Sequence, residues 1–520
     1  MADRRRGLRT GAKALLESIE RAGVEVVFGY PGNNVLDIFE HIPKARFRFV
    51  LGRHEQGSTH MADGYARATG RPGVVIVTSG PGATNAITGL ATANVDGVPM
   101  VLISGQVPLS QIGTDAFQEA DMTGICRGAT KHSFLVKSAD EIPETVAEAF
   151  YIATHGKPGA VVIDLPKNVQ EELTSAQYPE RISLRAYHPE CAATTTQVNR
   201  LARLINEAKR PVILAGGGVI ASNAAADVAA LAKKAGIPVA TTLMGIGSFD
   251  ENEPLSLGMV GLYGTPQANA AIDAADLILA LGVRFNDRVT GPRAARFGRR
   301  AKIVHVDCDP SSIDKNVQVS LGIVADIKDL LTTVASRVKR EVKVKGEGEE
   351  RNTTVHLTSS PSPELQSPTF NLQPLPDDAI IVTDVGENQM WCARQLTHSR
   401  PRHFISSGGM GTMGFAIPAA IGAAIARPDR KVIAIMGDGG AQMTSEELIV
   451  AVQEKLPIVF VVLNNRCLGM VREMPISSPD FVRLAAAYGL SGVRVDAAGA
   501  EKAIARALRK RRPTLVEVMI

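Results

Sequence analysis

The sequence contains no apolar run as long as the ~18 residues that a membrane-spanning helix needs, and its N-terminus lacks a hydrophobic signal core. Its five cysteines lie far apart without a Cys-x-x-Cys pair, which argues against a zinc site and against a disulfide framework. The formal net charge of +4 is small for 520 residues and gives no indication of nucleic-acid binding. We therefore expect a globular protein of the reducing cytoplasm, with neither nucleic acid nor membrane as a partner.

What the sequence does contain is a repeated alternation of short β-rich runs and helical stretches, which is typical of parallel α/β sheets. The alternation occupies three blocks, residues 1–185, 190–342 and 377–520. Residues 343–376 are rich in Pro, Ser and charge without a clear period, so they are interpreted as a linker. A chain of this length is too long for one core. The prediction is a fold of three consecutive parallel-sheet α/β domains.

The strongest motif lies in the third block. An apolar run ends in Gly437-Asp438-Gly439, a helical stretch follows, and 24 residues after the motif the next apolar run ends in Asn464-Asn465. Neighbouring parallel strands end at the same edge of a sheet, where ligands bind. Glycines let the backbone approach an anion, and a carboxylate with an amide oxygen suits Mg²⁺, so this spacing predicts a diphosphate held through magnesium. A glycine motif of this kind on its own would be interpreted as a tight turn.

These two strand ends resemble the cofactor signature of thiamine diphosphate (ThDP) enzymes. Such enzymes need a carboxylate beside the aminopyrimidine ring to activate the cofactor. The candidate is Glu55, which follows the apolar run FRFVLG and precedes DGYARATG, as in the catalytic glutamate segment of that family. Without this context, Glu55 would more often be a surface or capping residue.

The resemblance extends over most of the chain and becomes more specific. Segments such as TSGPGATNAITGLATA, LGVRFNDRVTG and SSGGMGTMGFAIPAAIGAA are similar to those of catalytic subunits of the acetohydroxyacid synthase (acetolactate synthase) family. This implies a ThDP pyrimidine-binding domain, a central FAD-binding-type domain and a domain that binds the ThDP diphosphate and Mg²⁺. The implied activity of the carboligase, a transferase, is decarboxylation of pyruvate on ThDP and transfer of the two-carbon unit to a second 2-oxo acid. Pyruvate would give 2-acetolactate and 2-oxobutyrate would give 2-aceto-2-hydroxybutyrate, in branched-chain amino-acid biosynthesis.

The resemblance also assigns roles to individual residues. Glu55, Gln118, Lys167 and Arg284 would be catalytic, with Phe117 also lining the pocket and Arg284 forming a bidentate pair with the substrate carboxylate. The implied metal ligands are Asp438, Asn465 and the carbonyl of Cys467. The implied ThDP-binding positions are Pro31, Gly32, Glu55, Gly386, Glu387, Asn388, Gly411, Met413, Gly437, Asp438, Gly439, Gly440, Asn465, Leu468, Gly469 and Met470. Outside this context, Phe117 and Met413 could be core residues and Lys167 a surface lysine.

A flavin is implied in the central block, where LAGGGVI resembles a dinucleotide-binding turn but lacks a clean GxGxxG. The implied FAD positions are Lys157, Gly216, Gly217, Thr242, Leu243, Met244, Gly264, Arg284, Arg288, Asp307 and Asp326. The acetolactate reaction has no net redox step, so this flavin would be structural. Without the resemblance, the glycine-rich turn would have suggested an oxidoreductase.

The chain departs from the family pattern at several points. Asn33 and Asn34 stand where the family has small residues; we expect Asn34 to cap the helix that follows and Asn33 to face the pocket. Lys157 replaces an arginine that contacts the flavin, which loses the planar fork. Met474 replaces a tryptophan at the start of a shortened covering segment, and the usual tail beyond Ile520 is absent. The last two changes are expected to weaken closure of the site.

Two other interpretations remain beside the acetolactate synthase hypothesis. The chain could be another ThDP-dependent 2-oxo acid decarboxylase or carboligase, or a catalytically impaired paralogue that still binds cofactor. For the leading hypothesis, the expected partners are small 2-oxo acids, further copies of the chain and a small regulatory subunit. The family resemblance implies a homodimer or homotetramer with active sites at the subunit interface.

Overall fold

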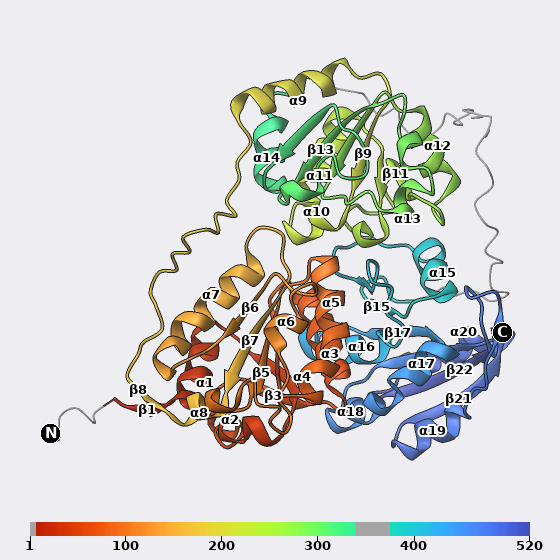
Figure 1. Ribbon diagram of the computed structural model, residues 1–520. Coiled ribbons are helices and arrows are strands. Elements are labelled where there is room, and N and C mark those ends of the chain that lie inside the picture. The colour runs from red at the N-terminus through yellow and green to blue at the C-terminus, as the bar shows by residue number, and fades with distance from the viewer. Residues whose placement is uncertain (1–6, 340–374) are drawn as a thin grey trace. The chain divides into compact units, whose positions relative to one another are not determined.

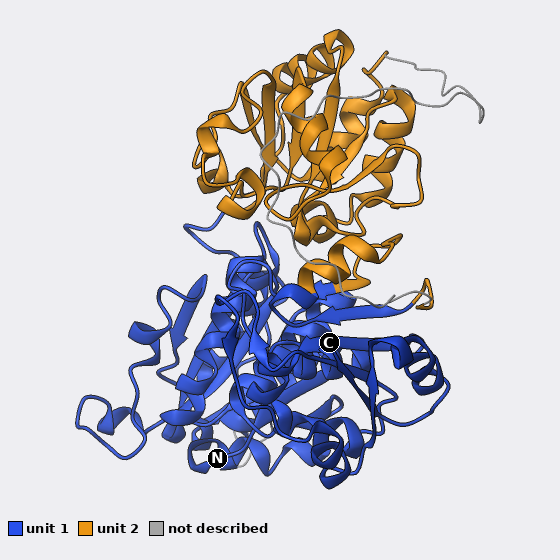
Figure 2. Ribbon diagram, turned by 90° about the vertical axis from the view of Figure 1, so that its right-hand side faces the viewer, with its two compact units in different colours: residues 1–188, 379–388, 405–520 blue, residues 189–378, 389–404 orange. Residues whose placement is uncertain are grey.

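The computed structural model describes residues 7–339 and 375–520 of the chain. Three six-stranded sheets are present, which confirms the predicted fold of three parallel-sheet α/β domains (Figure 1). The chain divides into two compact units: unit 1 comprises residues 1–188, 379–388 and 405–520, and unit 2 comprises 189–378 and 389–404 (Figure 2). The predicted linker lies outside the described residues apart from 375 and 376, and the domain boundaries stay predictions.

The first sheet of unit 1 has the strand order β3-β2-β4-β5-β7-β6, and every neighbouring pair is parallel. Its strands are β2 Val26–Tyr30, β3 Arg48–Leu51, β4 Gly73–Val77, β5 Met100–Gln106, β6 His132–Leu135 and β7 Ala160–Pro166. Its helices are α1 Gly11–Arg21, α2 Leu36–Phe39, α3 Glu55–Thr69, α4 Pro81–Asn85, α5 Ile87–Asp96, α6 Met122–Ile125, α7 Ile142–Thr154 and α8 Lys167–Glu171. The short strands β1 Arg9–Thr10 and β8 Leu173–Thr174 pair beside it.

The apolar runs are continuous because both faces of this sheet are covered. Along β4, Val74 and Ile76 belong to the core cluster that includes residues of α1 and α7, whereas Val75 and Val77 belong to the cluster of α3 and α5. Strand side chains alternate between faces, so a helix layer on each side buries every residue of β4 (Figure 1). This double coverage leaves the strand ends as the accessible parts of the sheet.

The second sheet of unit 1 has the order β16-β15-β17-β18-β22-β21. Its strands are β15 Ile380–Thr383, β16 Phe404–Ser406, β17 Val432–Gly437, β18 Val459–Asn464, β21 Ser491–Asp496 and β22 Thr514–Met519. The short strands β19 Cys467–Leu468 and β20 Met474–Pro475 form a separate pair. Its helices are α16 Ala416–Ala426, α17 Asp438–Met443, α18 Leu448–Gln453, α19 Phe481–Ala487 and α20 Ala500–Leu508, while α15 Glu387–Gln395 begins in unit 1 and continues into unit 2.

Unit 2 contains the remaining sheet, with the order β11-β10-β9-β12-β13-β14 and parallel pairing throughout. Its strands are β9 Pro211–Ala215, β10 Val239–Thr241, β11 Ser256–Met259, β12 Leu277–Leu281, β13 Lys302–Asp307 and β14 Leu321–Val324. Its helices are α9 Thr195–Glu207, α10 Gly217–Ala221, α11 Ala225–Ala235, α12 Pro266–Ala274, α13 Asp287–Thr290 and α14 Ile327–Ala335. Core clusters on both faces of this sheet bury it in the same way.

Helices α3 and α16 join the two sheets of unit 1. They cross so closely that a Cβ on Gly64 would lie 2.1 Å from the carbonyl oxygen of Ala419, and one on Gly422 would lie 1.8 Å from that of Met61. Backbone meets backbone at this crossing, which only glycine permits. One hydrophobic cluster continues from α3 through α16 into the second sheet, so the two halves of unit 1 share a core.

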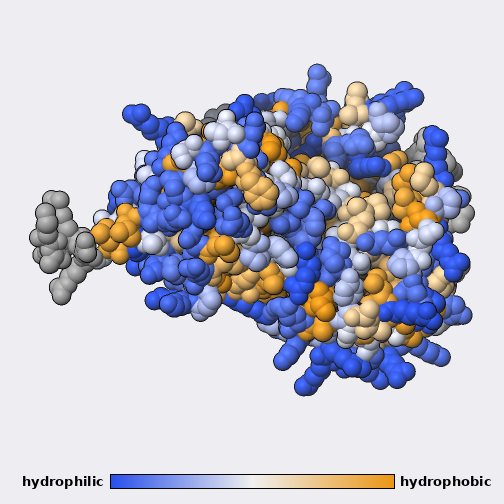
Figure 3. Space-filling view, turned by 60° about the horizontal axis from the view of Figure 1, so that its bottom comes forward, coloured by the Kyte–Doolittle hydropathy of each residue, from blue (hydrophilic) through white to orange (hydrophobic). Residues whose placement is uncertain are grey.

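On the face drawn in Figure 3, hydrophobic residues form small patches separated by hydrophilic side chains. Among residues 7–339 and 375–520, no helix combines the length and the apolar character required to cross a membrane. All five cysteines fall within these ranges and are free.

We predict that Gly64→Ala or Gly422→Ala lowers the free energy of unfolding of unit 1 by about 3 kcal/mol, because the added methyl overpacks the helix crossing. The midpoint of urea-induced unfolding measures the change. Gly128→Ala is the matched control, since a Cβ at Gly128 would have no atom within 4 Å. Equal midpoints for Gly64→Ala and Gly128→Ala would show that the crossing is not tight.

Candidate functional site

Glu55 is the first residue of α3, directly after the turn that follows β3. Its Oε2 accepts a hydrogen bond of 3.0 Å from the side-chain amide of Asn85, the last residue of α4. A Cβ on Gly82 would lie 3.3 Å from Glu55 Oε1, so the glycine leaves the space beside the carboxylate open. The predicted activating carboxylate is thus anchored at the carboxyl edge of the first sheet. Asn85 lies within a segment that the sequence resemblance covered, but it carried no separate signal.

The corner at Pro31 and Gly32 packs against the end of β4, where a Cβ on Gly32 would lie 2.5 Å from Thr78 Cβ. The Asn34 side chain is buried and donates a hydrogen bond of 2.6 Å to Ser79 Oγ. No side chain caps the short helices that start here, so the capping interpretation of Asn34 is wrong. The reason is that Ser79 offers Asn34 a tertiary partner; the exposed Asn33 keeps its pocket role as a prediction.

The loop after β5 carries two of the predicted pocket residues. Phe117 is 82% exposed, which excludes the core interpretation. Gln118 has a φ of +63° and packs against Gly80, and its side-chain oxygen is buried without a hydrogen-bond partner among the described residues. An orphaned buried acceptor is uncommon and fits a ligand that donates to it. Lys167 follows β7 as the first residue of α8.

The GDG motif forms the turn from β17 into α17, as its glycines predicted. Strands β17 and β18 are parallel neighbours, with Gly437 opposite Leu463, so the two motifs do end at one edge. The Asp438 side chain is buried at the start of α17. The side-chain amide of Asn464 donates a hydrogen bond to Glu517, so this residue has a structural role. Asn465 lies beyond the strand, and its side-chain oxygen accepts from the backbone N–H of Cys467.

The segment from Cys467 to Ser478, which we expected to be a shortened covering segment, folds over this corner. Strands β19 and β20 pair as a hairpin. Three side chains surround Gly439. A Cβ added there would lie 2.6 Å from the Leu468 side chain, 3.3 Å from Met413 Cε and 3.4 Å from the Ile476 side chain. Ser478 Oγ donates a hydrogen bond to Asp438 Oδ2. Ser478, which the sequence did not single out, therefore contacts the predicted magnesium ligand directly.

Three predicted cofactor positions lie just after β15. Gly386 has a φ of +141°, which favours glycine, and the Asn388 amide donates to the carbonyls of Asp384 and Ile435. Glu387 points towards the hairpin, since a Cβ on Gly469 would meet its Oε2 at 2.5 Å. Burial, with the nearby charge of Glu473, raises the pKa of Glu387. Gly440 is also required locally, because a Cβ there would meet Asp384 Oδ1 at 2.4 Å.

Glu447 connects the diphosphate half of the site to the Glu55 segment. Both of its carboxylate oxygens accept from the backbone N–H of Arg53 at 3.1 Å, and Oε1 also accepts from that of His54 at 3.0 Å. The side chain is fully buried against Gly57, where no Cβ would fit. Burial raises the pKa of Glu447 to about 7, against the lowering effect of these hydrogen bonds. No sequence motif marked this residue.

Most of the predicted flavin positions gather at the carboxyl edge of the sheet in unit 2. Gly216 follows β9 and Thr242 follows β10, Asp307 ends β13, and Asp326 caps α14. A Cβ on Gly217 would lie 3.2 Å from Met244 Cβ, which brings these two together. Leu243 lies in the same turn as Met244.

The other flavin candidates make contacts outside this cluster. Arg284 follows β12, and its carbonyl accepts from Asn316, while the guanidinium of Arg288 lies 5.9 Å from the centre of the Tyr263 ring. Gly264 closes a turn by donating to the carbonyl of Gly261. Lys157 belongs to unit 1, where its carbonyl accepts from Lys131 Nζ. The sequence offered no motif for His305, which is buried on β13; neither ring nitrogen makes a hydrogen bond within the described residues, and Nε2 lies 3.9 Å from Asp307 Oδ2.

Comparison with known proteins identifies the three domains. The N-terminal binding domain, central domain and C-terminal binding domain of thiamine pyrophosphate enzymes match residues 9–125, 198–334 and 384–518. The sequence is 43% identical to a probable acetolactate synthase large subunit of Methanocaldococcus jannaschii, over 98% of this chain and 92% of that protein. It is 41% identical to an acetolactate synthase large subunit of Haemophilus influenzae, over 94% and 90%, and 43% identical to one of Corynebacterium glutamicum, over 94% and 82%.

The three domains define a thiamine pyrophosphate enzyme, as expected from the strand-end motifs. Within that class, the chain belongs to the acetolactate synthase large-subunit family.

We predict that Glu447→Gln changes the pH dependence of stability. The folded-state pKa of about 7 lies above the ordinary 4.5, so this group favours folding most below pH 4.5, and the contribution is lost as the pH rises through 7. The variant has no ionisable group at this position and lacks that loss. The difference in free energy of unfolding, variant minus parent, should therefore rise by up to about 3 kcal/mol from acidic to mildly alkaline pH. Urea titrations across that range, with the exposed Glu501→Gln as control, measure it; parallel pH curves for parent and Glu447→Gln would contradict the assignment.

Proposed function

We propose that this chain is the catalytic subunit of an acetolactate synthase, which decarboxylates pyruvate and joins the two-carbon unit to a second 2-oxo acid. The observation that supports the proposal is that the residues implied for both halves of a ThDP site lie at sheet edges of unit 1. The anchored Glu55 stands at the edge of one sheet, and Asp438 with Asn465 stands at the edge of the other. The names of the relatives supply the reaction class.

The donor set fits magnesium and a diphosphate. Asp438, Asn465 and the Cys467 carbonyl offer only hard oxygen ligands, which Mg²⁺ prefers. In the described part of the chain no three His, Cys, Asp or Glu side chains converge as a metal site, so a softer metal has no competing ligand group there. Gly437 and Gly439 would let the diphosphate approach the backbone at the start of α17.

Bound ThDP would supply an electron sink for loss of CO₂ and a carbon nucleophile for the ligation. Glu55, held by Asn85, would exchange a proton with the pyrimidine ring of the cofactor. Gln118, whose buried side-chain oxygen has no hydrogen-bond partner among the described residues, would accept a hydrogen bond inside the pocket. The ammonium group of Lys167 would bind negative charge on the substrate. Arg284 would bind the carboxylate of the second 2-oxo acid through its planar fork.

FAD fits the glycine-lined edge of the sheet in unit 2 as a structural cofactor. The close approach of Gly216 to the Gly282 carbonyl and of Gly217 to Met244 leaves backbone rather than side chains at that edge. Asp307 stands at the end of β13, where an acidic residue can bind a ribose hydroxyl. Lys157 would contact the flavin less specifically than the usual arginine.

The active enzyme is proposed to be a homodimer or homotetramer with its sites at the subunit interface. Glu55 of one copy would act on the cofactor held by Asp438 of another. The relatives are named large subunits, which supports a small regulatory subunit as a further partner.

The decisive experiment supplies purified protein with pyruvate, ThDP, Mg²⁺ and FAD and measures acetolactate and CO₂. Glu55→Gln should lower the rate by about 10²- to 10⁴-fold, the range for loss of a positioned acid-base group. Glu207→Gln, on the exposed face of α9, should leave the rate unchanged. A parent that releases no CO₂ from pyruvate would disprove the function, and acetaldehyde in place of acetolactate would point to a simple decarboxylase.

We also predict that Ser478→Ala weakens Mg²⁺ binding by about tenfold in the presence of ThDP, because residues that orient a metal ligand typically contribute 10- to 100-fold. Ser478 donates to Asp438, whereas the adjacent Ser477 is exposed, so Ser477→Ala is the matched control. Isothermal titration with Mg²⁺ measures the affinity. An affinity for Ser478→Ala that equals that of the control would show that the hydroxyl does not orient Asp438.

A further inference from the structure

The loop of residues 407–413, called here the cofactor loop, connects β16 to α16 and carries two of the proposed ThDP-binding positions, Gly411 and Met413. Its middle is exposed at Gly409, Met410 and Gly411. A Cβ on Gly411 would meet only Val385, at 3.8 Å. Core packing therefore does not fix this part of the loop, and its conformation depends on how its two ends are held.

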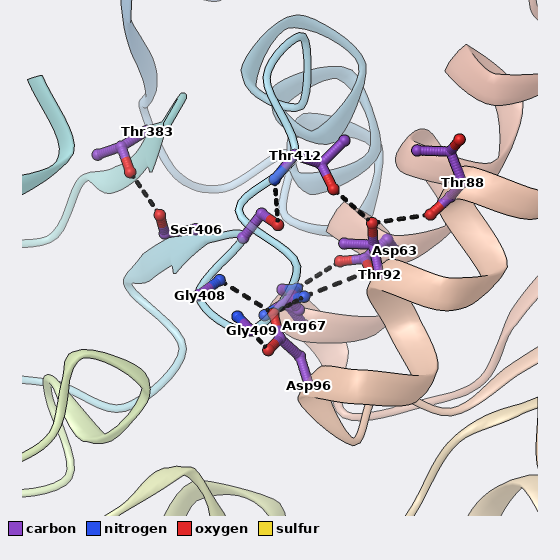
Figure 4. A network of polar contacts seen from close by, with 11 residues as sticks. Asp63, Arg67, Thr88, Thr92, Asp96, Thr383, Ser406, Gly408, Gly409 and Thr412 are labelled. Atoms are coloured by element: carbon purple, nitrogen blue, oxygen red, sulfur yellow. Dashed lines mark hydrogen bonds and ion pairs between the residues drawn. The ribbon is translucent and has the colours of Figure 1, made fainter. Parts of the chain in front are cut away.

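The start of the cofactor loop is held by a residue of the N-terminal half of the chain. The carboxylate of Asp96, the last residue of α5, accepts from the backbone N–H of Gly408 at 3.1 Å and from that of Gly409 at 2.8 Å (Figure 4). The Asp96 side chain is fully buried. A buried carboxylate that accepts two backbone hydrogen bonds fixes the orientation of two successive peptide groups.

Arg67 keeps Asp96 in place. Its Nη2 donates to Asp96 Oδ2 at 2.9 Å, and its Nε donates to Asp63 one helical turn earlier on α3 (Figure 4). Burial would lower the pKa of Arg67, but the two carboxylates raise it above its ordinary value, so the guanidinium stays charged. Breaking such a buried group is costly, which makes it a stable anchor.

The end of the cofactor loop is held twice. Thr412 Oγ1 and Thr92 Oγ1 are 2.7 Å apart, and Thr92 is a buried residue of α5 that also donates to the carbonyl of Thr88. That second bond makes Thr412 the donor to Thr92. Beyond it, the carboxylate of Asp384 accepts from the backbone N–H groups of Gly414 and Ala416.

Of these anchors, Asp384 belongs to the same sheet as the loop, whereas Asp96 and Thr92 belong to α5 of the first sheet. We infer that Thr92 and Asp96 are positioning residues for the cofactor: they hold residues 407–413 so that Gly411 and Met413 meet ThDP. They do so without touching it. This inference rests on the proposed assignment of Gly411 and Met413 to the cofactor site.

The test uses the intact chain and measures the Kd for ThDP in saturating Mg²⁺ by isothermal titration. Thr92→Val and Thr412→Val each keep the shape of the side chain and remove one partner of the hydroxyl pair. Each should raise the Kd about tenfold, and the double variant should show the same tenfold change rather than the product, because both remove one interaction. Thr88→Val, on an exposed side chain of the same helix, should leave the Kd unchanged.

Two further measurements separate positioning from general damage. Thr92→Ser retains the hydroxyl and should restore the parental Kd, although it removes a buried methyl. In turnover assays at saturating ThDP, the KM for pyruvate should stay at the parental value in Thr92→Val. If Thr92→Val does not fold, Thr412→Val on the half-buried loop gives the same comparison.

Unchanged ThDP affinity in both Thr→Val variants would overturn the inference, as would multiplicative effects in the double variant. The parent controls for the proposed function: a parent that binds ThDP and shows these shifts but makes no acetolactate would disprove the reaction and leave the positioning role intact. A parent that makes acetolactate, with no change in ThDP affinity in any variant, would support the reaction and disprove the positioning role.

Discussion

The contact between α3 and α16 is the constraint on which the site of unit 1 depends. Gly64 and Gly422 let the two helix backbones touch, and a single core continues across them. Glu55 begins the first helix, and the cofactor loop leads directly into the second. The helix pair thus fixes where each segment lies within one chain, more precisely than loops alone could, so that each is in place to meet its counterpart from the other copy in the proposed dimer.

Buried polar groups further fix the positions of the Glu55 segment and the cofactor loop. Glu447 binds the backbone just before Glu55, and Asp96 with Arg67 binds the backbone of the cofactor loop. Burying such groups is unfavourable unless every hydrogen bond is made, so they specify one arrangement of the segments and disfavour others. Hydrophobic contacts between the same elements would allow small shifts, and shifts of about 1 Å matter for catalysis.

Two of the expected departures from the family pattern, at Asn34 and in the segment after Cys467, lie near the proposed ThDP site, and the structure changes how they are understood. The segment after Cys467 reaches the GDG corner, where Ile476 packs over Gly439 and Ser478 donates a hydrogen bond to Asp438. The buried Asn34 side chain donates to Ser79, which ties the corner after β2 to the residues that follow β4. These contacts support the proposal of an active carboligase over an impaired paralogue, because the proposed magnesium ligand Asp438 is covered and hydrogen-bonded by this segment.

The sequence by itself determined the three parallel sheets, the strand ends at which Glu55 and Asp438 stand, and the family. Each of these depends on a local pattern: strand periodicity, glycine turns, or a motif of fixed spacing. Only the tertiary structure revealed Asn85, Glu447, Asp96 and Ser478, and only it corrected Asn34. Those residues act through partners that are distant in the chain, as Glu447 does with His54. Which side chains meet across such separations is decided by packing, and neither composition nor spacing encodes that outcome.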